Sequence, residues 1–322
     1  MKYKQLTLEK RYHISALKKQ GYNQKHIADE LGVHPSTISR ELKRNIFHSK
    51  YKALTAQTEY ALRQKKKSKY TALTKTIEKY IREKLKLDWS PEQISGRMKL
   101  EIQHSIHHET IYQFIYRNKA HGGRLYKYLR HKNKKYHHRS KEYQQRGTII
   151  DRVMIDKRPK IVDKKKRIGD LEIDTVIGKD HKGALVTVVD KKSKFTLIKK
   201  VNSKRASEVS EALIEMLTPI KPILQTITSD NGKEFAYHKD ISSALNTNFY
   251  FANPYHSWER GLNEHTNGLI RQYIPKKSEF ENISKEEIVT IQNRLNHRPR
   301  KSLNYKTPFE VFMKDFTLKM AA

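Results

Sequence analysis

The chain has 322 residues, of which 67 are Lys or Arg and 34 are Asp or Glu, so its formal net charge is +33. It contains no cysteine, which excludes disulfides, thiol nucleophiles and cysteine-ligated zinc. No secretory leader or apolar stretch of membrane-spanning length is present, so we expect a soluble cytoplasmic protein with a polyanionic partner.

The positive charge is concentrated in the first half of the chain. Residues 1–170 carry 43 Lys or Arg and 16 Asp or Glu, whereas residues 171–322 carry 24 and 18. A basic excess that served only solubility would be spread evenly. We therefore predict a basic part that contacts nucleic acid and a nearly balanced second part that folds around its own core.

Residues 7–45 have the pattern of three short helices. Thr7 and Asn23 are suitable N-caps, Gly32 suits a tight turn, and Pro35 suits the first position of a third helix. This spacing is typical of a helix-turn-helix domain, predicted over residues 1–50, whose last helix enters the DNA major groove. A plain three-helix bundle is the alternative, which the charge disfavours. The predicted DNA-contacting side chains are Ser36, Thr37, Ser39, Arg40, Lys43 and Arg44.

The middle of the chain alternates between basic linkers and helices. Residues 51–75 are predicted to be a basic linker and residues 76–120 a second helical domain, in which Ser90 caps a helix that begins at Pro91. This domain resembles a helix-turn-helix less closely than the first, and a structural spacer is the alternative. Residues 121–168, rich in Lys, Arg, His and Tyr, are predicted to be a second basic linker that follows DNA phosphates.

From residue 169 the apolar pattern changes to a period of two, which indicates strands. The predicted strands are 171–177, 184–190, 194–201, 223–229 and 248–251, and the predicted helices include 204–217 and 257–273. Short turns join the first three strands, and a helical crossover makes the fourth parallel to a neighbour. This order predicts an α/β ribonuclease-H-like fold over residues 169–322.

Three acidic residues lie where phosphoryl-transfer chemistry would place them. Asp174 is in the middle of the first strand, Asp230 ends the fourth, and Glu264 follows in a helix with 33 residues between it and Asp230. Three carboxylates are a minimal protein contribution to a pair of Mg²⁺ ions that clamp a phosphodiester. We predict two Mg²⁺ per site, for which Mn²⁺ can substitute. A single such acid would more often be an ordinary surface charge.

Neighbouring residues add to this candidate site. Glu172 shares the strand face of Asp174 and is predicted either as an outer-shell acid or as a solvated strand residue. Asn267 and Arg271 share the helical face of Glu264, so they are predicted to hold DNA phosphates. The alternative for Arg271 is a salt bridge that positions Glu264.

The sequence resembles the insertion-sequence-30 family of bacterial transposases over nearly its whole length. The resemblance rests on Ser36-Thr-Ile-Ser-Arg-Glu-Leu-Lys-Arg-Asn45, Ser229-Asp-Asn-Gly-Lys-Glu-Phe235, Trp258-Glu-Arg-Gly-Leu-Asn-Glu-His-Thr-Asn-Gly268 and Lys306-Thr-Pro-Phe-Glu-Val-Phe312. The family usually has Trp-Glu-Gly-Asp before its first catalytic acid, whereas Leu171-Glu-Ile-Asp174 stands here.

The resemblance implies an Asp-Asp-Glu transposase with an integrase-type catalytic core. Such an enzyme would bind the terminal inverted repeats of an insertion sequence, cut and join DNA strands, and act on target DNA. Two ends must be held together, so we expect a homo-oligomer, at least a dimer, in the bacterial cytoplasm and associated with the nucleoid, without a membrane partner. A DNA-binding repressor with an inactive core is one alternative. An RNA-processing ribonuclease H is another, but it leaves the helix-turn-helix unexplained.

Overall fold

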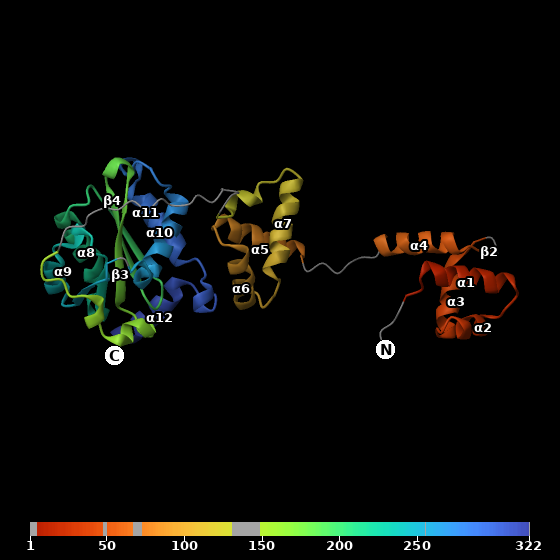
Figure 1. The fold of residues 1–322 in the computed structure, drawn as a ribbon. Helices are drawn as coiled ribbons and strands as arrows, with labels where there is room; N and C mark the ends of the chain where they lie inside the picture. Colours follow the sequence, from red (N-terminus) through yellow and green to blue (C-terminus); the bar gives the residue numbers. More distant parts are fainter. Residues whose placement is uncertain (1–4, 48–49, 67–72, 131–148, 255, 322) are drawn as a thin grey trace. The chain divides into compact units, whose positions relative to one another are not determined.

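The computed structural model describes residues 5–47, 50–66, 73–130, 149–254 and 256–321. The chain forms two units, Met1–Ala72 and Leu73–Ala322 (Figure 1). Within the described residues, no helix has both the length and the apolar character that crossing a membrane requires.

The first unit is helical, as its local signals predict. Its elements are α1 (Leu8–Lys19), α2 (Gln24–Glu30), α3 (Pro35–Asn45), β1 (Ile46–Phe47), β2 (Lys50–Tyr51) and α4 (Ala53–Lys66). Thr7 caps α1 and Asn23 caps α2, each accepting a hydrogen bond from a backbone N–H of the first turn. Gly32 has a φ of +59° in the turn before α3, a conformation that favours glycine. The predicted three-helix arrangement is confirmed.

A buried polar network joins four elements of this unit. Arg11 Nε donates to Glu41 Oε1 at 2.8 Å, the Tyr51 hydroxyl donates to the same oxygen at 3.0 Å, and Arg11 Nη1 donates to Gln57 Oε1 at 2.6 Å. The Arg11 and Glu41 side chains are only 3% and 9% exposed. Removing one member of a buried ion pair costs about 3–5 kcal/mol. The network therefore fixes α1 against α3, β2 and α4.

Residues 51–75, predicted as a linker, contain a fourteen-residue helix instead. Helix α4 buries Ala53 and Ala56 and packs on α1. Ala, Leu, Gln and Lys have high helix propensity, and the two small alanines let α4 lie close to its neighbour. The run of lysines that suggested a linker begins only at the last turn of this helix. Residues 67–72 lie outside the described residues.

The second unit opens with three helices in the segment predicted to be a second helical domain. They are α5 (Lys75–Lys86), α6 (Pro91–Glu101) and α7 (His108–Ala120), followed by the short 3-10 helix η1 (Leu125–Tyr128). Ser90 forms the predicted capping box with Gln93. Ile81, Ile94 and Ile115 are fully buried between the helices. The helical content predicted for residues 76–120 is confirmed.

Contacts link these helices to the end of the chain. Gly96 of α6 lies against the ring of Tyr305, so close that a Cβ at Gly96 would approach the ring to 2.3 Å. Arg97 Nη1 donates to Glu310 Oε2 at 2.8 Å, and Arg294 Nη1 donates to Asp88 Oδ2 at 2.7 Å. The middle helices therefore pack on the C-terminal part of the chain, whereas the sequence predicted a separate domain between two linkers.

A mixed five-stranded sheet forms the centre of the second unit. Its strands are β3 (Asp170–Ile177), β4 (Ala184–Asp190), β5 (Thr196–Val201), β6 (Thr226–Ser229) and β7 (Asn248–Phe251), in the spatial order β5-β4-β3-β6-β7. The β3–β4 and β4–β5 pairs are antiparallel, and the β3–β6 and β6–β7 pairs are parallel. This is the predicted ribonuclease-H-like order, which is confirmed.

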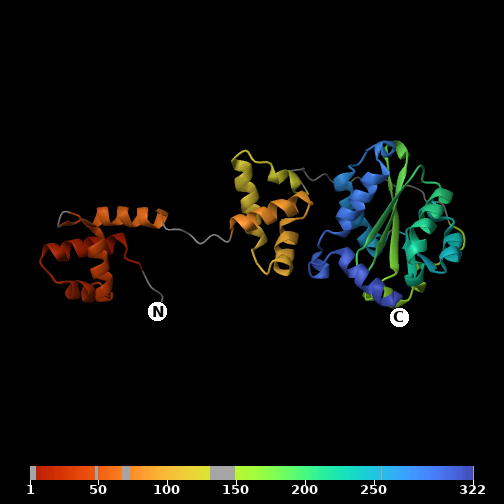
Figure 2. The same ribbon diagram turned by 180° about the vertical axis from the view of Figure 1, so that it is seen from behind.

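Helices cover both faces of the sheet (Figures 1 and 2). On one face lie α8 (Ala206–Leu217) and α9 (His238–Leu245), which pack on Leu171, Ile173 and Val186. On the other lie α10 (Gly261–Tyr273) and α11 (Lys285–Asn296), which pack on Val176 and Leu185. The chain ends with α12 (Pro308–Met320). Alternation along β3 thus directs Leu171 and Ile173 to one helical layer and Val176 to the other.

The second predicted linker, residues 121–168, is only partly described. Residues 131–148 lie outside the described residues. On either side of them the chain forms short 3-10 helices, η1 and then Ile155–Lys157 and Lys160–Lys164. Val162 is fully buried, and Phe251 of β7 donates its backbone N–H to the Val153 carbonyl oxygen. Residues 153–164 are therefore anchored to the folded core at a few points, since Met154 packs on the core beside Phe251 and Val162 is buried.

Candidate active site

The pairing of β3 with β6 brings two of the predicted acids to one place. Glu172 of β3 is opposite Thr228 of β6 in a parallel register. Asp174 and Asp230 each follow two residues later, so their carboxylates meet where β6 ends. Gly232 N donates to Asp230 Oδ1 at 2.9 Å, which fixes that carboxylate in the loop after the strand.

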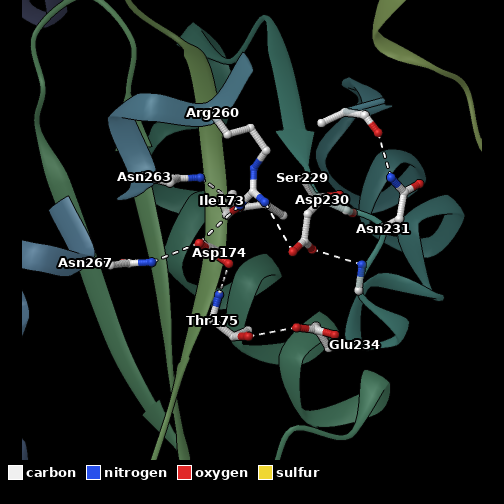
Figure 3. A network of polar contacts seen from close by, with 12 residues as sticks. Ile173, Asp174, Thr175, Ser229, Asp230, Asn231, Glu234, Arg260, Asn263 and Asn267 are labelled. Carbon is white, nitrogen blue, oxygen red and sulfur yellow. Dashed lines mark hydrogen bonds and ion pairs between the residues drawn. The ribbon is translucent and has the colours of Figure 1, made fainter. Parts of the chain in front are cut away.

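Arg260 lies between the two carboxylates (Figure 3). Its Nη2 is 3.3 Å from Asp174 Oδ2, and its Nη1 is 3.3 Å from Asp230 Oδ2. The same guanidinium donates to the Ile173 carbonyl oxygen at 2.8 Å. The side chains of Arg260, Asp174 and Asp230 are 11%, 21% and 30% exposed. One cation thus holds two partly buried carboxylates together.

Helix α10 is tied to β3 through a row of polar side chains (Figure 3). Asn263 Nδ2 donates to the Ile173 carbonyl oxygen at 3.0 Å, and Asn267 Nδ2 donates to Asp174 Oδ2 at 2.9 Å. Arg271 Nη2 donates to the Ile177 carbonyl oxygen at 2.8 Å. These residues recur every three or four positions, so they share one helical face. The row sets the distance and register between α10 and Asp174.

Burial and the ion pair act in opposite directions on the pKa values of Asp174 and Arg260. Burial raises the pKa of Asp174, the Asp230 charge raises it further, and Arg260 opposes both. Burial lowers the pKa of Arg260, but the two aspartates outweigh it, so that the net direction is upward. A cation between the two carboxylates therefore favours the ionised form of Asp174, and Arg260 supplies that cation here.

Glu264 does not join the two aspartates directly. Its side chain is exposed on α10, one turn from Arg260 on one side and Asn267 on the other. In the part of the chain that the structure describes, no group of three His, Cys, Asp or Glu side chains is close enough to hold a metal ion. The geometry gives a two-carboxylate cation site. Its donors are oxygens, which suit Mg²⁺ and Mn²⁺.

The other predicted site residues have specific partners. Glu172 forms a 2.6 Å ion pair with Lys191, and both side chains are 3% exposed. Its charge still raises the pKa of Arg260, so it belongs to the same electrostatic environment. Asn267 holds Asp174, and Arg271 donates to backbone carbonyl oxygens of Ile177 and Pro275.

The sequence assigned no role to three side chains that the fold brings to the site. Arg260 is the most important of them, because it contacts both aspartates. Its position four residues before Glu264 indicated a shared helical face but not this contact. The second is Asn263, which donates to the Ile173 carbonyl oxygen. The third, Glu234, is 4% exposed, accepts from Thr175 Oγ1 at 2.8 Å and pairs with Lys204 at 2.9 Å.

The predicted DNA-contacting side chains of the first unit lie on α3. Ser39, Arg40, Lys43 and Arg44 are exposed, whereas Ser36 and Thr37 are half-buried. The Ser36 hydroxyl lies 2.9 Å from His34 Nδ1, and the Ser36 N–H donates to the same nitrogen. His34 is therefore the N-cap of this helix. The exposed part of α3 carries three cations and no acid.

Comparisons with known proteins match this organisation. Residues 2–45 match the model of a helix-turn-helix domain family. The transposase for insertion sequence element IS4351 of Bacteroides fragilis is 46% identical over 96% of this chain and 95% of its own length. Transposase InsI for insertion sequence element IS30A of Escherichia coli is 34% identical over 97% of this chain and 84% of its own.

One further sequence relative and one solved structure carry integrase names. A putative integrase of Spiroplasma virus SpV1-R8A2 B is 30% identical over 98% of this chain and 97% of its own length. The crystal structure of the catalytic core domain of BIV integrase covers 47% of this chain and 98% of its own, with 15% identity and a TM-score of 0.38.

Proposed function

Because this chain belongs to the IS30 family of insertion-sequence transposases, we propose that it cuts DNA at the ends of a mobile element and joins the freed ends to target DNA. The observation that carries this proposal is the pair Asp174 and Asp230, held 3.3 Å from one shared guanidinium at the end of β6. The chain couples that acidic pair to a helix-turn-helix domain, which supplies DNA binding.

Asp174, Asp230 and Glu264 are the residues that would hold divalent cations. Glu264 lies one helical turn from both Arg260 and Asn267, each of which reaches Asp174, so we propose that Glu264 joins the two aspartates only when DNA and metal are bound. When bound, two Mg²⁺ ions would stabilise the charge that develops at phosphorus and lower the pKa of the attacking water. Asn267 and Gly232 N orient the two aspartates for this role by one hydrogen bond each.

Strand cleavage and strand transfer are the same displacement with different nucleophiles. In cleavage, water attacks phosphorus and the 3′-oxygen leaves as a hydroxyl after taking up a proton. In transfer, that 3′-hydroxyl attacks a phosphodiester of the target, and a new 3′-oxygen leaves. Neither step needs a covalent bond to the protein, so one acidic site serves both. Since two element ends must be joined in one event, we infer that at least two copies of the chain act together.

The test is metal-dependent nicking of element-end DNA. We expect the full chain to nick a duplex that carries the terminal inverted repeat in Mg²⁺ or Mn²⁺, and to leave it intact in excess chelator. A duplex of the same length and composition with a scrambled repeat is the matched control. Tight binding of the repeat without nicking in either metal would contradict the enzyme and favour a repressor. That alternative has one observation in its favour, namely that Arg260 already supplies one cation to the acidic pair.

We propose that α3 reads the inverted repeat in the major groove. Replacing the exposed Arg40 with Ala is expected to reduce affinity for the repeat by about tenfold and to leave binding of unrelated DNA nearly unchanged, because a base-edge contact is worth about 1–3 kcal/mol. Footprinting measures binding to the repeat, and competition with an unrelated duplex measures the affinity for unrelated DNA. Lys43→Ala is the comparison, since a phosphate contact should weaken both kinds of binding equally. An unchanged footprint for Arg40→Ala would remove this assignment.

A further inference from the structure

A second site, which is positively charged, lies on the side of α10 that carries His265 and Leu269, away from the residues that face the acidic pair. A cavity of about 500 Å³ is lined by α7, η1, α10 and the segment after α11. Three arginines line it: Arg130, Arg298 and Arg300. They come from segments far apart in the sequence, which the packing of the middle helices on the core brings together. We call this site the arginine cavity.

Among the described residues, Arg298 and Arg300 donate hydrogen bonds to neutral oxygens. Arg298, which is 3% exposed, donates to the side-chain oxygens of Gln93 and Gln272. Arg300 Nη2 donates to the Leu295 carbonyl oxygen, and its Nε is buried without a hydrogen-bond partner among the described residues. No carboxylate of the described residues forms an ion pair with Arg130, Arg298 or Arg300. Arg298 is buried, Arg300 is half-buried and Arg130 is exposed. A buried guanidinium without a counter-ion among the described residues is costly, so Arg298 and Arg300 favour a bound anion.

The acids nearest the cavity are already neutralised. Asp88 and Glu92 line it, but Asp88 binds Arg294 at 2.7 Å and Glu92 binds Lys301 at 2.6 Å. The remaining charge is strongly positive. Burial lowers the pKa of Arg300 to about 10, and repulsion from Arg298 and Arg130 acts in the same direction. At neutral pH Arg300 still carries its charge, so an anion would find three cations.

The absence of a side chain at Gly268 of α10 leaves room beside the helix for the guanidinium of Arg130. A Cβ at this position would approach Arg130 Nη2 to 3.1 Å. The guanidinium of Arg130 therefore lies close to the helix that also carries Asn267, the partner of Asp174. His265 and Leu269 line the cavity from the same helix. Since a helix with its side chains is about 10–12 Å wide, the cavity and the acidic pair are separated by roughly three base-pair steps of DNA.

The opposite wall of the cavity is rich in tyrosine. Tyr112 and Tyr116 stack with ring centroids 6.1 Å apart, and Lys119 lies 4.7 Å from the ring centroid of Tyr126. Flat aromatic side chains beside cations are the combination that binds single nucleic-acid strands, through base stacking and phosphate contacts. The cavity is also larger than a phosphate group alone would need.

We propose that the arginine cavity binds one phosphate of the DNA strand on which the acidic pair acts, with the adjoining nucleoside against the tyrosine wall. This rests on the proposed function for the identity of the strand. The cavity thereby positions the strand a few nucleotides from the reacting phosphodiester. It also assigns a role to the middle helices, since α7 and η1 supply the tyrosine wall and the chain from η1 supplies Arg130.

The test combines protein variants with neutral phosphates. The full chain with Asp230→Asn, which is not expected to cut, is titrated with an end-repeat duplex in which single phosphates are replaced by methylphosphonates. We expect one position near the cleavage site where the replacement weakens binding about tenfold. In the chain that also carries Arg130→Gln and Arg300→Gln, the same replacement should have no further effect, because the partner of that phosphate is gone. The slope of log affinity against log salt should fall by about one.

Three controls separate the outcomes. Lys221→Gln with Lys314→Gln removes two exposed charges of the same unit outside the cavity and should leave the methylphosphonate effect intact. Arg130→Lys with Arg300→Lys keeps both charges and should retain part of the methylphosphonate effect. Thermal melting verifies that each variant is folded. Equal losses at every phosphate in all proteins would overturn the proposal. So would stabilisation by inorganic phosphate alone without any coupled DNA position. A wild-type chain that fails to nick leaves this binding test unaffected, so the two proposals fail separately.

Discussion

Replacing Asp230 with Asn is expected to lower the rate of strand cleavage at least about 1000-fold. Asp230 is the acid at the end of β6, and the amide that replaces it cannot hold a divalent cation with the same charge. Loss of several kcal/mol of charge stabilisation at the transition state corresponds to three or more factors of ten in rate. Single-turnover nicking of labelled end-repeat duplex in Mg²⁺ and in Mn²⁺ measures the loss.

The folded structure should survive this substitution. Asn is nearly the same size as Asp, and the backbone N–H of Gly232 can still donate to its side-chain oxygen. Repeat binding, measured by anisotropy, is therefore expected to stay within about threefold of wild type, which separates a lost reaction from a lost fold. Cleavage above one-tenth of the wild-type rate would contradict the assignment of Asp230.

Glu264→Gln is the matched variant for the third acid. Gln has nearly the same size as Glu, and Glu264 is exposed on α10, so thermal melting of this variant verifies that it is folded. An equal loss of cleavage in this variant would place Glu264 with the two aspartates during the reaction. Cleavage at the wild-type rate would leave Asp174 and Asp230 as a two-carboxylate site.

Replacing Arg260 with Gln is expected to make the metal-free protein less stable by about 2 kcal/mol, and divalent metal should restore the loss. Removing one partner of a fully buried ion pair costs about 3–5 kcal/mol, and the two aspartates here are partly exposed, which reduces the effect. Without Arg260 the two carboxylates face each other without a cation. A bound Mn²⁺ or Mg²⁺ ion would replace that charge, so metal should raise the melting temperature more in the variant than in wild type.

The pH dependence of this variant has a definite sign. Burial already raises the pKa of Asp174 in the folded chain, and Arg260 opposes that rise. Without Arg260 the pKa rises further, so the folded state binds a proton more readily than the unfolded state does. The stability deficit is then present above the folded-state pKa of Asp174 and shrinks as the pH falls through it.

Thermal melts with chelator and with Mn²⁺, at several pH values, measure both effects. Lys191→Gln is a useful comparison, because it removes the cation of the neighbouring buried pair with Glu172. Its loss of stability should not be restored by metal. A metal response of Arg260→Gln no larger than that of wild type would show that Arg260 does not occupy the cation position.

Local signals were enough to predict most of the helices and strands. Thr7, Asn23 and Ser90 are N-caps whose side chains bond to backbone N–H groups within the next turn, so each helix start is encoded next to where it acts. The alternation in β3 likewise separated Ile173 from Asp174. The linker predicted over residues 51–75 was wrong because charge dominated that interpretation, whereas α4 is held by Ala53 and Ala56 against α1.

The sequence by itself predicted the family, the helix-turn-helix and the succession of strands and helices in the core, and it proposed Asp174 and Asp230 as candidates, because each depends on neighbouring residues or on a motif of fixed spacing. Only the tertiary structure decided that Arg260 lies between Asp174 and Asp230, that Glu172 is buried against Lys191, and that Arg130 and Arg300 line one cavity. These arrangements bring together residues up to 170 positions apart in the sequence. Their geometry depends on strand register and on how helices dock, and no local pattern of charge or hydrophobicity specifies either.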